Sequence, residues 1–138
     1  MGFARRIVFD TGVLVSAAIL PDSTPAMALE KAWLHFEVCV STETLAELET
    51  VLPRPKFDRY ADAALRRAFI DGFRKHACPV AVERTVTDCA DPADNKFLAL
   101  AETAGAELIV SSDPHLNDLH PWRGIPIIPP PAFLVAIR

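Results

Sequence analysis

The sequence predicts an α/β fold with three layers, in which helices cover both faces of a central, mostly parallel sheet of about five short strands. Two observations support this prediction. Short apolar runs alternate with longer helical patterns along the chain, as is typical of parallel sheets with helical crossovers. No internal repeat, low-complexity tract or linker interrupts this alternation, so residues 1–138 are expected to form a single domain.

Five apolar runs have the length and the residue types of buried strands. They are residues 7–9, 36–40, 80–82, 108–110 and 125–128. The carboxyl ends of parallel strands meet at one edge of an open sheet, and that edge is where such folds build their sites. Functional side chains are therefore expected directly after these strands.

Capping residues mark the helix boundaries. Thr24 and Asp91, each followed by proline, and Ser41, followed by an acidic turn, are typical helix starts, because a short polar side chain accepts hydrogen bonds from the free amides there. Gly105 is placed to end the helix that begins after Asp91. The prolines at 129–131 predict a turn into a short final helix.

The composition indicates a soluble, folded chain. Hydrophobic residues make up 51% of the sequence, yet no apolar run approaches the roughly 20 residues of a membrane helix. Arg5 and Arg6 before an apolar stretch imitate a secretory signal, but Asp10 and Gly12 interrupt that stretch. We therefore expect a cytoplasmic protein that is mature from its first residues and does not enter a membrane.

Cysteine and histidine spacing argues against disulfides and zinc. The three cysteines, Cys39, Cys78 and Cys89, are odd in number and contain no C-x-x-C pair. The histidines also lack zinc-ligand spacing; they are His35, His76, His115 and His120. The cysteines are therefore interpreted as small apolar residues.

The formal charge of -4 is unevenly distributed. Residues 54–75 carry seven basic and three acidic side chains, a net charge of +4, which leaves -8 for the rest of the chain. A protein that collects metal on one surface and meets a polyanion on another would show this asymmetry. A solvated helix face would also produce it.

Two aspartates lie just after predicted strands. Asp10 comes after the first strand, and Asp113 comes shortly after the strand at 108–110. Both are expected at the carboxyl edge of the sheet, where a carboxylate would face whatever binds there. Each has a second interpretation, because an aspartate at a strand-to-helix turn is also a common N-cap.

Asp94 begins an apolar helical stripe, with Phe97, Leu98 and Ala101 at the following positions of the same face. A carboxylate on the inward face must be paired or coordinated, so a metal is an economical partner. The alternative is that Asp94 assists the Asp91 cap and the helix dipole.

The helix after Ser41 carries Glu47 and Glu49, which flank its buried stripe from opposite sides, and periodicity alone does not choose between them. Hard oxygen ligands such as these suit Mg²⁺ or Mn²⁺. Three polar residues lie beside the acids in the sequence. They would either orient the carboxylates or be ordinary polar neighbours; they are Asn95, Ser111 and Ser112.

Five blocks of sequence, in this order, carry a resemblance to a known family. They are VFDTGVLVSA at 8–17, AEL at 46–48, LPRPKF at 52–57, DPADNKFL at 91–98 and VSSD at 110–113. The chain resembles PIN-domain proteins over nearly its whole length, most closely the VapC-like toxin components of bacterial type II toxin-antitoxin systems. The ordered set is far more specific than any single block.

The resemblance implies a PIN-like fold and places Asp10, Glu47, Asp94 and Asp113 at the positions of the family's catalytic, metal-binding acids. This comparison selects Glu47 over Glu49. It implies an endoribonuclease that uses Mg²⁺ or Mn²⁺ to activate water and hydrolyse phosphodiester bonds of single-stranded RNA. Basic residues would guide the RNA backbone; they are Arg54, Lys56, Arg59, Arg66 and Arg67.

The toxin branch also implies a small antitoxin as a partner and leaves a homodimer open. Two positions depart from the family pattern. Gly12 stands where the family commonly has Asn, and His115 stands where many members have another acid. Both lie near the implied metals, so they bear on the surroundings of the acids and on how firmly a second ion is held.

Three other functions were weighed. Asp10, Thr11 and Gly12 form the aspartic-protease triplet, but those enzymes are all-β, and this chain has no second such triplet, which only a homodimer could supply. A haloacid-type phosphotransfer module would need an Asp-x-Asp pair after the first strand, which is absent here. The third alternative is a catalytically weak or inactive PIN-like module that binds RNA or protein.

Overall fold

Five short parallel strands form one sheet in the computed structural model, which describes residues 4–137. The strand order is β3-β2-β1-β4-β5, and every pairing between neighbours is parallel. The strands are β1 (Arg6–Phe9), β2 (Glu37–Val40), β3 (Cys78–Pro79), β4 (Leu108–Val110) and β5 (Ile127–Ile128). The expected parallel sheet of about five short strands is confirmed.

Helices connect the strands. They are α1 (Thr11–Ile19), α2 (Thr24–His35), α3 (Thr42–Val51), α4 (Ala63–His76), α5 (Asn95–Ala104), α6 (Pro114–Asn117) and α7 (Pro130–Ala136), with 3-10 turns η1 (Pro55–Phe57) and η2 (Pro92–Asp94). Among residues 4–137, no single helix is long and apolar enough to span a membrane; α1 and α2 meet the length and composition criteria only as a pair bent by 106°.

The helix boundaries follow the caps read from the sequence. Ser41 caps α3 in a reciprocal capping box, in which Thr44 N donates to Ser41 Oγ at 3.1 Å and Ser41 N donates to Thr44 Oγ1 at 2.9 Å. Gly105 ends α5 in the left-handed conformation, at φ 64°, which a residue without Cβ adopts without strain. The N-cap of α2 is Ser23, one residue before the expected Thr24.

The third strand lies earlier than expected. The prediction at residues 80–82 is wrong, because the strand is Cys78–Pro79 and Cys39 pairs in register with Cys78. Val80 N donates to Val40 O at 2.8 Å, after which the chain leaves the sheet. The side chains of Val80 and Val82 still pack against a core cluster, and this accounts for their apolar character.

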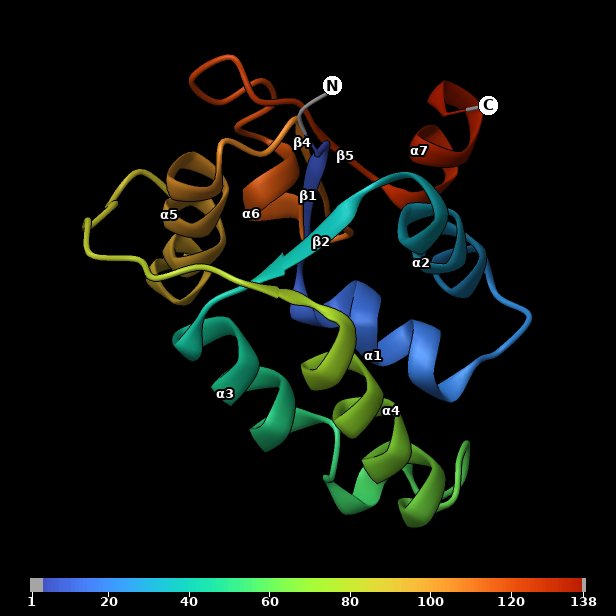
Figure 1. The fold of residues 1–138 in the computed structure, drawn as a ribbon. Coiled ribbons are helices and arrows are strands. Elements are labelled where there is room, and N and C mark those ends of the chain that lie inside the picture. Colours follow the sequence, from blue (N-terminus) through green and yellow to red (C-terminus); the bar gives the residue numbers. More distant parts are fainter. Residues whose placement is uncertain (1–3, 138) are drawn as a thin grey trace.

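Alternate strand residues separate two hydrophobic cores, as the pleat of a sheet requires. Ile7 and Phe9 pack in a core with residues of α1, α2, α3, α4 and α7. Val8 packs in a second core with residues of α5 and α6. Figure 1 shows α5 and α6 on one side of the central strands, and α2 and α7 on the other. The three-layer α/β/α arrangement is confirmed.

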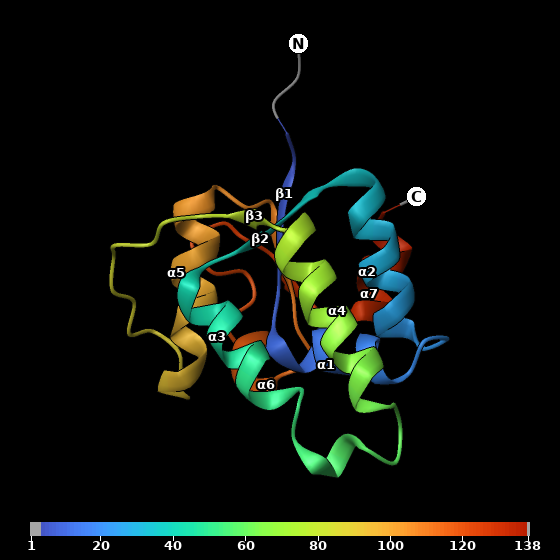
Figure 2. The same cartoon turned by 60° about the horizontal axis from the view of Figure 1, so that its bottom comes forward.

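Two of the inner strands lead into the same edge of the sheet. Strand β1 continues directly into Asp10 and α1, and β4 continues through Ser111–Asp113 into α6. In Figure 2, β1 runs from the N-terminal end toward α1, and α6 lies at the same end of the molecule. This topology positions the acidic side chains described next.

Candidate metal centre

A cavity of about 350 Å³ lies at the carboxyl edge of the sheet. The structure brings all four acids singled out in the sequence to its wall, although they come from four separate segments. The lining residues are Asp10, Thr11, Gly12, Glu47, Asp94, Phe97, Ser112, Asp113 and Pro114.

Asp10 is buried and fixed through both carboxylate oxygens. Its Oδ1 accepts a hydrogen bond from Val13 N at 2.8 Å, which makes it the N-cap of α1, and its Oδ2 accepts from the hydroxyl of Ser111. Burial raises the pKa of Asp10, while the hydrogen bonds from Ser111 and Val13 oppose this increase. Asp10 therefore has the structural role of a cap and also faces the cavity.

Asp94 is the least compensated acid of the site. It is 9% exposed, and its buried Oδ2 has no hydrogen-bond partner within the described part of the chain. Burial, followed by the neighbouring Asp113, raises the pKa of Asp94 to about 7. A buried carboxylate oxygen without a donor is costly, so this atom marks the position at which a cation would be most stabilising.

Asp113 caps α6, because its Oδ1 accepts from His115 N at 2.8 Å. The imidazole Nδ1 of His115 lies 3.5 Å from the same oxygen. Ligand atoms of Asp91, Asp94, Asp113 and His115 all lie within 4.8 Å of one another. Three carboxylates and an imidazole thus converge, and this donor set fits a divalent cation.

Asp91 and His115 were not singled out as ligands from the sequence. The sequence predicts a helix cap at Asp91, and Asp91 does accept a hydrogen bond from Ala93 N at 3.0 Å. Its spacing of three residues before Asp94 was an available signal for a shared site. His115 had been noted only as a departure from the family pattern.

Glu47 and Glu49 point to different surroundings. Glu47 lines the cavity, and its Oε2 lies 2.7 Å from Lys96 Nζ. Glu49 is exposed and pairs with Arg74 at 2.6 Å. The structure therefore places Glu47, and not Glu49, beside the other acids.

The basic residues expected to meet RNA divide into two groups. Four are exposed on the segment from η1 to α4; they are Arg54, Lys56, Arg59 and Arg67. Arg66 departs from the expectation, because it is only 1% exposed. Its guanidinium donates to the carbonyl oxygens of Leu52, Arg54 and Ala61 and pairs with Asp58. Arg66 is therefore a structural residue of the α3–α4 connection.

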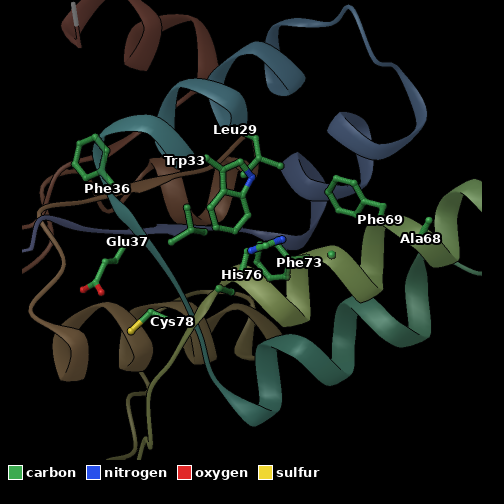
Figure 3. Close-up of a pocket in the computed structure, with 12 residues that line it drawn as sticks. Leu29, Trp33, Phe36, Glu37, Ala68, Phe69, Phe73, His76 and Cys78 are labelled. Carbon is green, nitrogen blue, oxygen red and sulfur yellow. The ribbon is translucent and has the colours of Figure 1, made fainter.

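A larger cavity, of about 780 Å³, lies elsewhere, between α2 and α4 and against β2. Figure 3 shows Trp33 and Phe73 close together in the middle of the lining, with Phe36 and Phe69 farther out on either side. Its lining is mainly apolar, and its acid, Glu37, is paired with Arg6. The smaller acidic cavity is the better candidate for chemistry, because the buried carboxylate oxygen of Asp94 there has no hydrogen-bond partner among residues 4–137.

A family model described as PIN domain matches residues 6–115. No curated protein matches the sequence. Among solved structures, the chain is similar to VapBC2 from Rickettsia felis, bound to a DNA fragment from its promoter. The two superimpose with a TM-score of 0.59, which covers 88% of this chain and 96% of that chain, at 11% sequence identity. At that identity the likeness concerns the fold alone. PIN domains are generally nucleases that use divalent metals, and the acidic cluster agrees with such use. The chain belongs to the PIN-domain family.

Proposed function

We propose that this protein is a metal-dependent endoribonuclease that hydrolyses phosphodiester bonds of single-stranded RNA, and that it acts as the toxin of a toxin-antitoxin pair. The observation that carries this proposal is the buried Oδ2 of Asp94, which has no hydrogen-bond partner among residues 4–137 and lies in a cavity that Asp10, Glu47 and Asp113 also line. Four carboxylates in one cavity of a PIN-domain chain are difficult to explain by helix capping alone.

In this proposal Asp94 and Asp113 hold Mg²⁺ or Mn²⁺, and Asp10 and Glu47 complete the acidic wall. A bound divalent ion supplies Lewis acidity that favours attack of water on the phosphodiester. Asp10 is held in one orientation by Val13 N and the Ser111 hydroxyl. Held in this way, the carboxylate does not have to be reordered when RNA binds.

RNA would approach from the end of the molecule that carries the site. The segment between α3 and α4 projects at the same end as α1 and α6 (Figure 2). Its exposed cations, together with Arg67 of α4, would contact the phosphate backbone; they are Arg54, Lys56 and Arg59. Binding through such contacts weakens as salt rises, because bound counterions are released when the cations meet phosphate.

The proposed toxin role requires a protein partner. One structural neighbour is a VapBC2 assembly, and the apolar cavity in Figure 3 supplies aromatic surface that a small antitoxin would cover. Trp33 lines this cavity, so binding of a candidate antitoxin should change tryptophan fluorescence. A Phe69→Glu variant should weaken the complex without altering nuclease activity.

The direct test is cleavage of end-labelled single-stranded RNA by the purified chain with Mg²⁺ or Mn²⁺. Wild type should cut, whereas samples with EDTA and the Asp94→Asn variant should not. Glu49→Gln is the matched control, because Glu49 lies on α3 but pairs with Arg74 on the exposed surface. Cleavage by Asp94→Asn at the wild-type rate would reject the site. RNA binding without cleavage in either metal would instead favour the catalytically inactive binding module.

A further inference from the structure

The acids around the cavity differ in how far the protein already compensates their charge. Glu47 is neutralised by Lys96 at 2.7 Å. Both oxygens of Asp10 accept hydrogen bonds. In contrast, Asp94 Oδ2 is buried and has no hydrogen-bond partner in the part of the chain that the structure describes. A cation gains most free energy where negative charge is least compensated, and that position is on the Asp94 side of the cavity.

Two residues beyond the four acids of the proposed site bring ligand atoms close to the Asp94 carboxylate. Asp91 lies one turn before Asp94, and His115 follows Asp113 in the first turn of α6. Asp91 and Asp113 each use Oδ1 as a cap, and the caps leave the second oxygen of each carboxylate for another ligand. The ligand atoms of all four residues lie within 4.8 Å of one another.

These separations are close to those around one ion. Opposite ligands of an octahedral ion with bonds of about 2.1 Å are roughly 4.2 Å apart. Modest side-chain adjustments would therefore bring the four ligand atoms around one cation. His115 is free to adjust, because about half of its side chain is exposed.

We infer that Asp91 and His115 join Asp94 and Asp113 in a three-carboxylate, one-imidazole site that binds Mn²⁺ in preference to Mg²⁺. This inference rests on the proposed function and deepens it by assigning the ion and two further ligands. Mg²⁺ is a hard ion that takes oxygen ligands in a near-ideal octahedron and rarely gives up water for imidazole. Transition ions accept imidazole readily. His115 therefore biases the site away from Mg²⁺.

The test is metal binding to the full chain, freed of metal and without RNA, measured by calorimetry with Mn²⁺ and with Mg²⁺. Wild type should bind Mn²⁺ about tenfold or more tightly than Mg²⁺, since Mn²⁺ accepts the imidazole more readily and even outer-shell partners of a metal change its affinity about tenfold or more. His115→Ala should weaken Mn²⁺ binding about tenfold and leave Mg²⁺ binding nearly unchanged. His115→Asp should reduce the preference by strengthening Mg²⁺ binding.

Asp91→Asn should weaken the binding of both ions, and His35→Ala is the control, because His35 is an exposed histidine on α2. Thermal melting of each variant checks that it folds. A Mn²⁺ to Mg²⁺ preference that is the same in wild type, His115→Ala and His115→Asp would overturn the inference, as would unchanged affinities in Asp91→Asn. These outcomes are separate from nuclease activity. A chain that binds Mn²⁺ through His115 but cuts no RNA would reject the proposed function and keep the metal assignment.

Discussion

Lys96 Nζ lies 2.7 Å from Glu47 Oε2, and the same ammonium group donates a hydrogen bond to the carbonyl of Ala93. Both side chains of this ion pair are largely shielded, at 16% and 27% exposed. Lys96 is two residues after Asp94, so the start of α5 supplies both an anion and a cation to the acidic site. A divalent ion that uses Glu47 as a ligand must therefore compete with Lys96.

This competition predicts the behaviour of Lys96→Met. Without the ammonium group, Glu47 adds uncompensated charge to the cavity, so the metal-free protein should lose about 1 kcal/mol of stability. Added Mn²⁺ should then raise its melting temperature more than it raises that of wild type, because a ligand stabilises the state that it binds. Melting curves with EDTA and with Mn²⁺ measure both effects.

Arg74→Met is the matched control for Lys96→Met. Arg74 pairs with Glu49, which lies on α3 as Glu47 does, but this ion pair is on the exposed surface. Its loss should leave the response to Mn²⁺ unchanged. Equal metal responses in the two variants would show that Lys96 does not compete for the Glu47 carboxylate.

Asp94→Asn should change how stability depends on pH in the metal-free protein. The pKa of Asp94 is raised to about 7 by burial and by Asp113, so the folded state holds this proton more tightly than the unfolded state does. The protonated group favours folding below the ordinary value of 3.8, and this stability is lost as pH rises toward 7. Asparagine does not ionise, so the Asp94→Asn variant does not lose this stability as pH rises.

Urea unfolding in EDTA measures this difference. At pH 8 Asp94→Asn should be more stable than wild type by about 1–2 kcal/mol, a figure that allows for solvent in the cavity. Near pH 4 the two should be similar. Mn²⁺ should reverse the order at pH 8, because only wild type retains the full ligand set. A wild-type stability that is flat between pH 4 and 8 would contradict the argument.

Local signals account for the parts of the fold that the sequence predicted well. Asp10, Ser41 and Gly105 act through the next few residues of chain, and each was found at the helix boundary expected for it. The third strand was misplaced because Val80 and Val82 are as apolar as a strand, and their packing against the second core explains this equally well.

The site was predictable only in part, because its remaining features depend on contacts between distant segments. Asp91 and His115 come together through the approach of η2 to α6, which no local pattern records. Periodicity did not separate Glu47 from Glu49, whereas the packing of α3 against α5 brings Glu47 to Lys96. The burial of Arg66 depends on a carbonyl group 14 residues earlier in the chain.

Arg66 and its neighbour Arg67 should therefore have different roles. Arg66→Met removes the donors for the carbonyls of Leu52, Arg54 and Ala61, and it should destabilise the fold by about 2–4 kcal/mol. Arg67→Met should leave stability unchanged and lower RNA affinity, with a weaker dependence on salt. Urea unfolding and RNA titrations at several salt concentrations measure the two effects. An unaltered unfolding midpoint in Arg66→Met would refute the structural assignment.

Gly12→Asn tests the departure from the family pattern beside the acids. A Cβ at this position would lie 3.7 Å from Asp10 Oδ1 and 3.8 Å from Ser112 Oγ, which are ordinary contacts. The Cβ of an asparagine therefore fits without displacing either neighbour, and its amide would lie beside the acidic wall, where it can donate a hydrogen bond. We expect divalent-metal affinity to rise about threefold to tenfold, as when an outer hydrogen bond to a ligand is restored. Stability should be unchanged or slightly higher, because glycine is unfavourable within a helix.

Gly72→Asn on α4 is the control, since a Cβ there meets nothing within 4 Å. Weaker metal binding in Gly12→Asn, with the control unchanged, would mean that this chain requires the open space at position 12 and that its site is organised differently from that of relatives with asparagine there.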